Sequence, residues 1–144
     1  MKRLASERGN ALIETALTLP LVLLVSVSIF EFGRAFQTWE VLTNAAREGA
    51  RVAVLPGSTA NDVQTRVAAY LASGQLDNAA NATVVVNQAA SVMIGANAAP
   101  ASLVTVNYPF SFIVLQPVAQ LLVNGSTLGA PFTMAAKSEM RNEQ

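Results

Sequence analysis

A run of sixteen uncharged residues near the N-terminus, residues 15–30, constrains this chain more than any other feature of its sequence. Leu and Val dominate the run, which lies between Glu14 and Glu31. A helix of that length is about 24 Å long at 1.5 Å per residue, and the hydrocarbon core of a bilayer is about 30 Å thick. Because apolar residues continue on both sides, the sequence predicts a membrane-spanning helix over residues 11–36. The alternatives are a buried core helix and a cleaved secretory signal.

Charged residues at the two ends of this predicted span need partners. Glu31 and Arg34 are three residues apart, so they share a helix face and can partly neutralise each other. At the other end, a carboxylate such as that of Glu14 costs about 2.5–3.5 kcal/mol on membrane-insertion scales. Cleavage after Gly9 would give Asn10 a free α-ammonium about one helical turn from Glu14, able to pair with it in the same chain or a neighbour. Otherwise Glu14 lies near the lipid headgroups and Gly9 is an ordinary flexible residue.

The basic residues around the span give only a mild indication of its orientation. Three precede the uncharged run of residues 15–30, namely Lys2, Arg3 and Arg8, and three follow it, namely Arg34, Arg47 and Arg51. The first three are packed closer to the span, which favours a cytoplasmic N-terminus. In the secretory alternative, Ser26-Val27-Ser28 has the small-x-small pattern of a signal peptidase site. That alternative describes a secreted or membrane-tethered, non-catalytic binding domain.

The composition excludes several classes of protein. Nine basic and nine acidic residues do not cluster, so the chain lacks the basic surface of a nucleic-acid-binding protein. The absence of cysteine and histidine excludes Cys/His metal sites and Ser-His or Cys-His catalysis. The acids beyond Arg51 are scattered and form no evident pair for acid–base catalysis: Asp62, Asp77, Glu139 and Glu143. We therefore expect a protein that is not an enzyme and has no cofactor and no metal.

The rest of the chain predicts an α+β domain. The first helix continues beyond the span to about Leu55, with an apolar stripe at helical spacing. A second helix begins at Ser58 or Thr59, has Asp62 in its first turn and ends at Gly74. Residues 78–136 carry no charge. Within and after them we predict strands over 84–87 and 103–108, and a connection over 91–100 whose apolar part, 92–94, is either strand edge or loop. We also predict a short helix over 115–123, either buried or at the membrane surface, and a last strand over 128–140 with Pro131 at an edge or bulge.

Two groups of residues leave two interpretations open. Arg47 and Arg51 are one helical turn apart, so they are either contacts for a partner subunit or part of a solvated face screened by Glu48. Phe110, Phe112 and Ile113 form either core packing or an exposed apolar patch for subunit contact.

Several motifs resemble those of a known family. The run Gly9-Asn10-Ala11-Leu12-Ile13-Glu14, followed by an apolar helix, resembles the type IV prepilin processing site. The longer stretch from Arg8 to Pro20, then Glu31-Phe32-Gly33-Arg34, and the run Asn44-Ala45-Ala46-Arg47-Glu48-Gly49-Ala50-Arg51 are similar to the TadE-like family. The ending Met140-Arg141-Asn142-Glu143 also resembles the family's usual ending.

The resemblance implies a minor pseudopilin of the tight-adherence (Flp) pilus system, which serves surface adhesion. It implies a basic leader (residues 1–9), a transmembrane helix (10–36) and an extracytoplasmic pilin-like domain (37–144) in the bacterial inner membrane. A prepilin peptidase would cut between Gly9 and Asn10, Glu14 would guide assembly, and Pro20 would bend the stem. The implied partners are that peptidase, the major Flp pilin, a TadF-like subunit and the inner-membrane assembly platform. Possible subunit contacts are Glu31, Arg34, Arg47 and Arg51.

Overall fold

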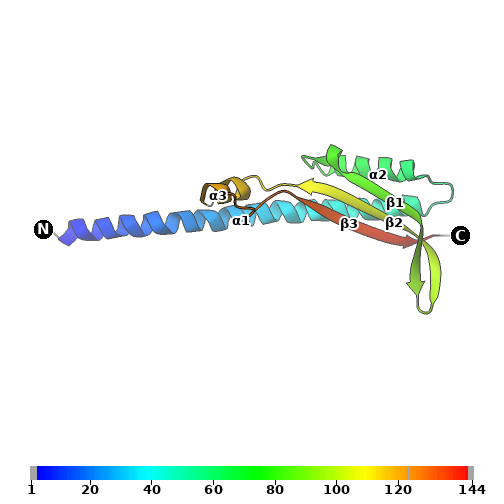
Figure 1. Cartoon of the computed structure of the whole chain (residues 1–144), viewed down its shortest axis with the longest axis horizontal. Helices are drawn as coiled ribbons and strands as arrows, with labels where there is room; N and C mark the ends of the chain where they lie inside the picture. The colour runs from blue at the N-terminus through cyan, green and yellow to red at the C-terminus, as the bar shows by residue number, and fades with distance from the viewer. Residues whose placement is uncertain (1–2, 123, 143–144) are drawn as a thin grey trace. The chain divides into compact units, whose positions relative to one another are not determined.

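A computed structural model describes residues 3–122 and 124–142 of the chain (Figure 1). The predicted leader residues Met1 and Lys2 lie outside the described residues, as do Val123 and Glu143. The elements in chain order are α1 (Arg3–Ala53), α2 (Ala60–Ser73), the 3-10 turn η1 (Ala79–Asn81), β1 (Thr83–Ile94), β2 (Asn97–Phe110), α3 (Leu115–Leu122) and β3 (Phe132–Arg141). This α+β arrangement confirms the predicted fold class.

The described residues form two compact units. The first unit contains α1 up to Arg34 together with the segment Phe112–Gly129, which carries α3. The second unit contains Ala35–Ser111 and the residues from Ala130 onward, and so includes the rest of α1, α2 and the sheet.

Helix α1 is long and apolar enough to cross a membrane. It has 51 residues and continues through Pro20 without interruption. From Gly9 onward its most apolar window has a mean hydropathy of 2.1, and none of that window is buried. Every side chain from residue 10 to residue 26 is exposed. A helix that is apolar all round and uncovered suits an apolar solvent, so α1 is compatible with a single-pass membrane protein.

The core of the second unit lies where α1 meets α2 and the sheet. The predicted apolar stripe is confirmed, since Leu42, Ala45 and Ala46 of α1 are completely buried. At Gly49 the α1 backbone comes very close to its neighbours. A Cβ placed there would lie 2.6 Å from a methyl of Val67 and 3.2 Å from a methyl of Val104. The absence of a side chain at this position therefore sets the distance between the two helices and β2.

Helix α2 has the ends that the sequence predicts. Thr59 is the N-cap, and its side chain accepts a hydrogen bond from the backbone N–H of Asp62, whose carboxylate accepts one from the backbone N–H of Thr59. This capping box satisfies two donors at the helix start. Gly74 is the C-cap. The buried face comprises Val63, Val67 and Leu71, and the neighbouring Tyr70 is half-buried.

The sheet corrects the predicted strand boundaries. Its three strands lie in the order β1-β2-β3, and both neighbouring pairs are antiparallel. Within the predicted connection over residues 91–100, the strand alternative for 92–94 is confirmed. The rest of that prediction is wrong, because Ile94 pairs with Asn97 across a two-residue turn that contains Gly95 with φ of +63°. Backbone pairing across that turn extends the strands through small residues that lack β propensity themselves. Strand β3 begins only after Pro131, since proline has no N–H to donate to a ladder.

A bulge in β1 contains a residue that donates hydrogen bonds to the C-terminus of α1. The register shifts between Asn87 and Ala90, where a β-bulge redirects the strand's side chains. The amide of Gln88 donates hydrogen bonds of 3.2 Å to the carbonyl of Ala53 and 3.1 Å to that of Ser58. The hydroxyl of Ser102 also donates to the Ala53 carbonyl, at 3.3 Å. Helix ends leave carbonyls without intrahelical partners, and here the sheet supplies donors for one of them.

Two carboxylates of the second unit, the half-buried Glu48 and the exposed Asp62, make the unit sensitive to acid. A hydrogen bond from Arg66, 2.6 Å long, holds the pKa of Glu48 below its ordinary value, and Arg51 adds a longer ion pair of 3.4 Å. Hydrogen bonds with Thr59 likewise lower the pKa of Asp62. A carboxyl with a lowered folded-state pKa contributes stability above its unfolded-state pKa and loses it as pH falls through the folded-state value.

We therefore expect acid to remove the contribution of these two carboxylates. At pH 7 the double variant Glu48→Gln, Asp62→Asn should unfold at a lower temperature than the wild type. The difference between the two proteins should shrink as pH falls below about 4, where unfolded carboxyls become protonated. Thermal unfolding of the full chain in detergent, followed by circular dichroism from pH 7 to pH 2, measures it. A difference that stays constant over that range would contradict the assignment.

Candidate functional site

One face of α1 in the first unit carries a regularly spaced set of residues. Pro20, Leu24, Val27, Glu31 and Arg34 follow one another at intervals of three and four residues, so they line one side of the helix. We call these five residues the docking face, and Phe112–Gly129 the α3 segment. The two belong to the same compact unit.

Glu31 fixes the α3 segment to the docking face. Its side chain is completely buried, and Oε1 accepts hydrogen bonds from the backbone N–H groups of Ile113 at 2.8 Å and Val114 at 2.6 Å. These two residues immediately precede α3. Helix N-termini have unpaired N–H groups and attract negative charge, so a carboxylate is well suited to this position.

Arg34 completes the site. Its guanidinium lies 2.9 Å from Oε2 of Glu31, as the three-residue spacing predicts, and about a quarter of its side chain is exposed. Both oxygens of the Glu31 carboxylate are therefore used within the chain. A buried carboxylate is stable only when paired and hydrogen-bonded, and these contacts meet that requirement. That Glu31 and Arg34 also contact another subunit stays a prediction.

Aromatic packing adds to the contact beside Glu31. The rings of Phe32 and Phe112 meet edge to face, with centroids 6.3 Å apart and planes at 76°. The three residues of the predicted apolar patch thus have different environments: Phe110 is buried in the second unit, Phe112 is half-buried, and Ile113 is 57% exposed. Of the two alternatives, core packing is confirmed for Phe110, and an exposed position is confirmed for Ile113.

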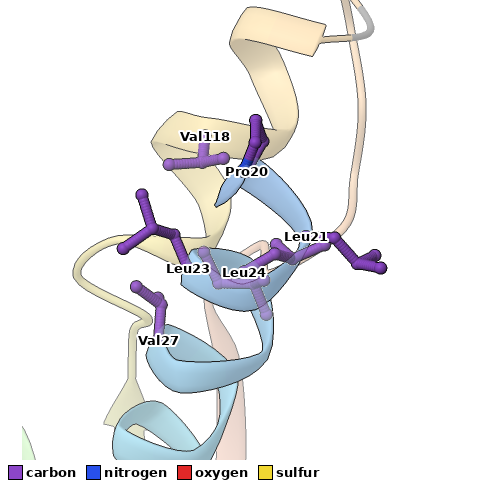
Figure 2. A pocket seen from close by; sticks show the side chains of 7 residues that line it. Pro20, Leu21, Leu23, Leu24, Val27 and Val118 are labelled. Atoms are coloured by element: carbon purple, nitrogen blue, oxygen red, sulfur yellow. The ribbon is translucent and has the colours of Figure 1, made fainter. Parts of the chain in front are cut away.

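An apolar groove lies between the docking face and α3, and Figure 2 shows side chains from both helices around it. Its volume is about 550 Å³. All the residues that line it are aliphatic or proline: Pro20, Leu21, Leu23, Leu24, Val27, Leu115 and Val118. Pro20 forms part of the groove wall. Its role as a stem kink stays a prediction.

A tight turn closes the α3 segment. Gly129 has a φ of +75°, and a Cβ on it would lie 2.8 Å from the backbone nitrogen of Gln116. Both the positive φ and the close approach require glycine. Gly125 also has a positive φ, of +80°, but a Cβ there would meet nothing within 4 Å.

The predicted processing residues lie apart from this contact, toward the start of α1. Gly9, Asn10 and Glu14 are all helical. The side chains of Asn10 and Glu14 are exposed. The hydroxyl of Thr18 donates to the backbone carbonyl of Glu14 at 2.9 Å. The structure thus places the Glu14 carboxylate on an exposed helix surface, with the polar Asn10 and Thr18 one turn before and after it.

Arg47 and Arg51 have separate environments in the second unit. Arg51 pairs with Glu48 at 3.4 Å, as the solvated-face interpretation has it. Arg47 is exposed and lines a shallow hollow along one side of α1, together with Phe36, Trp39, Glu40, Thr43 and Asn44. A role for either arginine in subunit contact stays a prediction.

Comparison with known proteins concerns the N-terminal part of the chain. A family model described as TadE-like protein matches residues 9–51. This segment is TadE-like. The match confirms the resemblance seen in the sequence, and it supports a protein associated with the Tad pilus system. No curated protein and no solved structure matches the chain. The TadE-like segment contains the whole docking face, whereas the α3 segment lies outside the match.

Sequence reasoning missed the partners of Glu31. It paired Glu31 with Arg34 alone, although Ile113 and Val114, 82 and 83 residues further on, bind the other carboxylate oxygen. Backbone N–H groups have no side-chain signature. The available signal was indirect: a second carboxylate beside an apolar span, and an uncharged apolar segment able to cover it.

Proposed function

We propose that this TadE-like chain is a minor pilin-like subunit of the Tad (Flp) pilus system and has a structural role. Helix α1 holds it in the bacterial inner membrane, with the N-terminus in the cytoplasm and residues 37–144 on the extracytoplasmic side, except for the α3 segment, which stays against the membrane-spanning part of α1. One observation carries the proposal: the TadE-like match falls on a helix whose side chains from residue 10 to residue 26 are exposed and mostly apolar. Such a surface has to be covered by lipid or by other helices.

In this proposal a prepilin peptidase cuts after Gly9, and the new ammonium of Asn10 becomes available. Glu14 is exposed on α1, so its carboxylate can pair with an ammonium of its own chain or of a neighbouring subunit. In hydrocarbon an unpaired carboxylate is costly, so such a pair favours helices that stand in the correct register. The partners are the peptidase, the major Flp pilin, a TadF-like subunit and the inner-membrane assembly platform, and the assembled pilus serves surface adhesion.

The proposal is tested by comparing wild type with Glu14→Ala in native membranes. We expect both proteins to be membrane-bound and the wild-type chain to begin at Asn10 by mass spectrometry. The variant should fail to co-purify with sheared pili and the other pilin-like subunits, because its α1 lacks the pairing carboxylate. Glu139→Ala, which removes an exposed acid on β3, is the control and should behave as wild type.

Two outcomes would contradict this function. Normal piliation by Glu14→Ala would exclude the assembly role of that carboxylate. A mature chain that begins at Ile29 would indicate an ordinary signal peptide, and an intact N-terminus would indicate an anchor that the peptidase does not process.

A further inference from the structure

We propose that the apolar groove between the docking face and α3 holds an acyl chain of a phospholipid from the surrounding bilayer. The inference rests on α1 crossing a membrane, as in the proposed function. The groove has the size usual for a small-molecule site, a few hundred cubic ångströms, and its walls are aliphatic throughout (Figure 2). Its walls thus match a hydrocarbon chain and offer nothing to a polar ligand.

The position of the groove along α1 places it in the hydrocarbon region of the bilayer. About 20 helical residues cross a 30 Å hydrocarbon core, and the residues from Ala11 to Phe30 provide that length. Glu31 then lies at the boundary, and the groove residues from Pro20 to Val27 lie inside the hydrocarbon region. The groove is continuous with the exposed apolar surface of α1, so lipid reaches it directly.

The α3 segment can enter this region because it brings no charge with it. Residues 78–136 contain no acidic or basic residue, so neither does the segment 112–129. The carboxylate to which it is attached is compensated by Arg34 and by two N–H groups. The backbone of α3 is helical, so the N–H groups of its last turn are bonded within the helix, and the Val118 N–H donates to the Val114 carbonyl at 3.1 Å; a membrane favours such internal pairing. Ile113 and Leu128, 57% and 61% exposed, extend the apolar surface of the segment toward lipid.

Filling by an acyl chain is favoured over an empty or a wet groove. Water enters a cavity only where polar groups bind it, and the described residues that line the groove are all aliphatic or proline. An empty groove would leave its walls without the dispersion contacts that a chain of methylenes provides. Lipid surrounds every copy of the protein, so an acyl chain is the occupant present at the highest concentration.

The test uses the full chain in phospholipid vesicles that contain a phospholipid with a diazirine in its acyl chain. After irradiation, fragmentation mass spectrometry locates the labelled residues. Leu17 is 73% exposed and reports the bulk bilayer, whereas Leu115 is only 9% exposed and lines the groove, so only a chain inside the groove reaches it. We expect label on both residues. Val85 on β1 is 57% exposed and should remain unlabelled.

Two variants tie the label to the groove. Val118→Phe fills the groove and should abolish labelling of Leu115 while leaving that of Leu17 unchanged. Leu128→Phe makes an aromatic change at an exposed residue outside the groove and should leave both labels as in the wild type. Label on Leu17 but not on Leu115 would overturn the inference and leave the membrane span intact, as would be seen if a neighbouring helix filled the groove. Label on neither would overturn the span as well, and label that persists in Val118→Phe would place the lipid elsewhere.

Discussion

Replacing Glu31 with alanine is expected to release the α3 segment from α1 while α1 stays helical. The change removes the acceptor of the Ile113 and Val114 N–H groups and leaves the Arg34 guanidinium without its carboxylate. Breaking a buried ion pair by removing one partner costs about 3–5 kcal/mol, and the lower end of that range applies here because about a quarter of the Arg34 side chain is exposed. If opening of the segment limits exchange, these two amides should exchange with deuterium about a hundredfold faster or more, because 1.4 kcal/mol is a factor of ten. Hydrogen exchange of the full chain in detergent measures the exchange rates of the Ile113 and Val114 amides in the wild type and the variant.

Two comparisons separate this docking role from a general loss of structure. Glu31→Gln keeps an oxygen that can accept from both N–H groups but loses the charge, so its effect should be smaller than that of alanine. Gly129→Ala should loosen the same segment with Glu31 intact, because the added Cβ meets a backbone nitrogen at 2.8 Å in a positive-φ conformation. Gly125→Ala introduces the same positive-φ strain without a close contact of the Cβ, so it should loosen the segment less than Gly129→Ala does. Unchanged protection of Ile113 and Val114 in Glu31→Ala would contradict the docking role.

Features determined by a few neighbouring residues could be predicted from the sequence. The start of α2 depends on Thr59 and Asp62, and its end depends on Gly74, all within one helix. The Glu31–Arg34 pair needed only a spacing of three on a helix. In each case the interacting groups are neighbours along the chain, so local rules suffice.

Features that depend on partners far along the chain could not be predicted in the same way. The hairpin between β1 and β2 passes through Ala and Asn residues with little β propensity, and its pairing is set by the neighbouring strand. The partners of Glu31 are backbone groups more than eighty residues away. Gly49 reads in the sequence only as a weak point of a helix, whereas in the structure it is a close approach of α1 to α2 and β2.

That close approach leads to the second large prediction, for Gly49→Val. The Cβ alone would come within 2.6 Å of the Val67 side chain, and the two added methyls have no space beside Val63 and Val104. Overpacking a core costs about 1–3 kcal/mol, occasionally more, and helix propensity returns only a few tenths of that. We expect the second unit to unfold at a temperature lower by roughly 10 °C, since 1 kcal/mol corresponds to about 4–8 °C in a domain of this size.

Gly33→Val is the matched control, because it makes the same chemical change in the same helix where a Cβ would meet nothing within 4 Å. Its unfolding temperature should equal or slightly exceed that of the wild type, since valine has a higher helix propensity than glycine. Thermal unfolding of both full-length variants in detergent, followed by near-ultraviolet circular dichroism, gives the comparison. If both variants shift equally, the loss arises from valine in a helix and not from contact with α2. A lower unfolding temperature in Gly49→Val alone would mean that the absence of a side chain at residue 49 sets how closely α1 packs against α2 and β2.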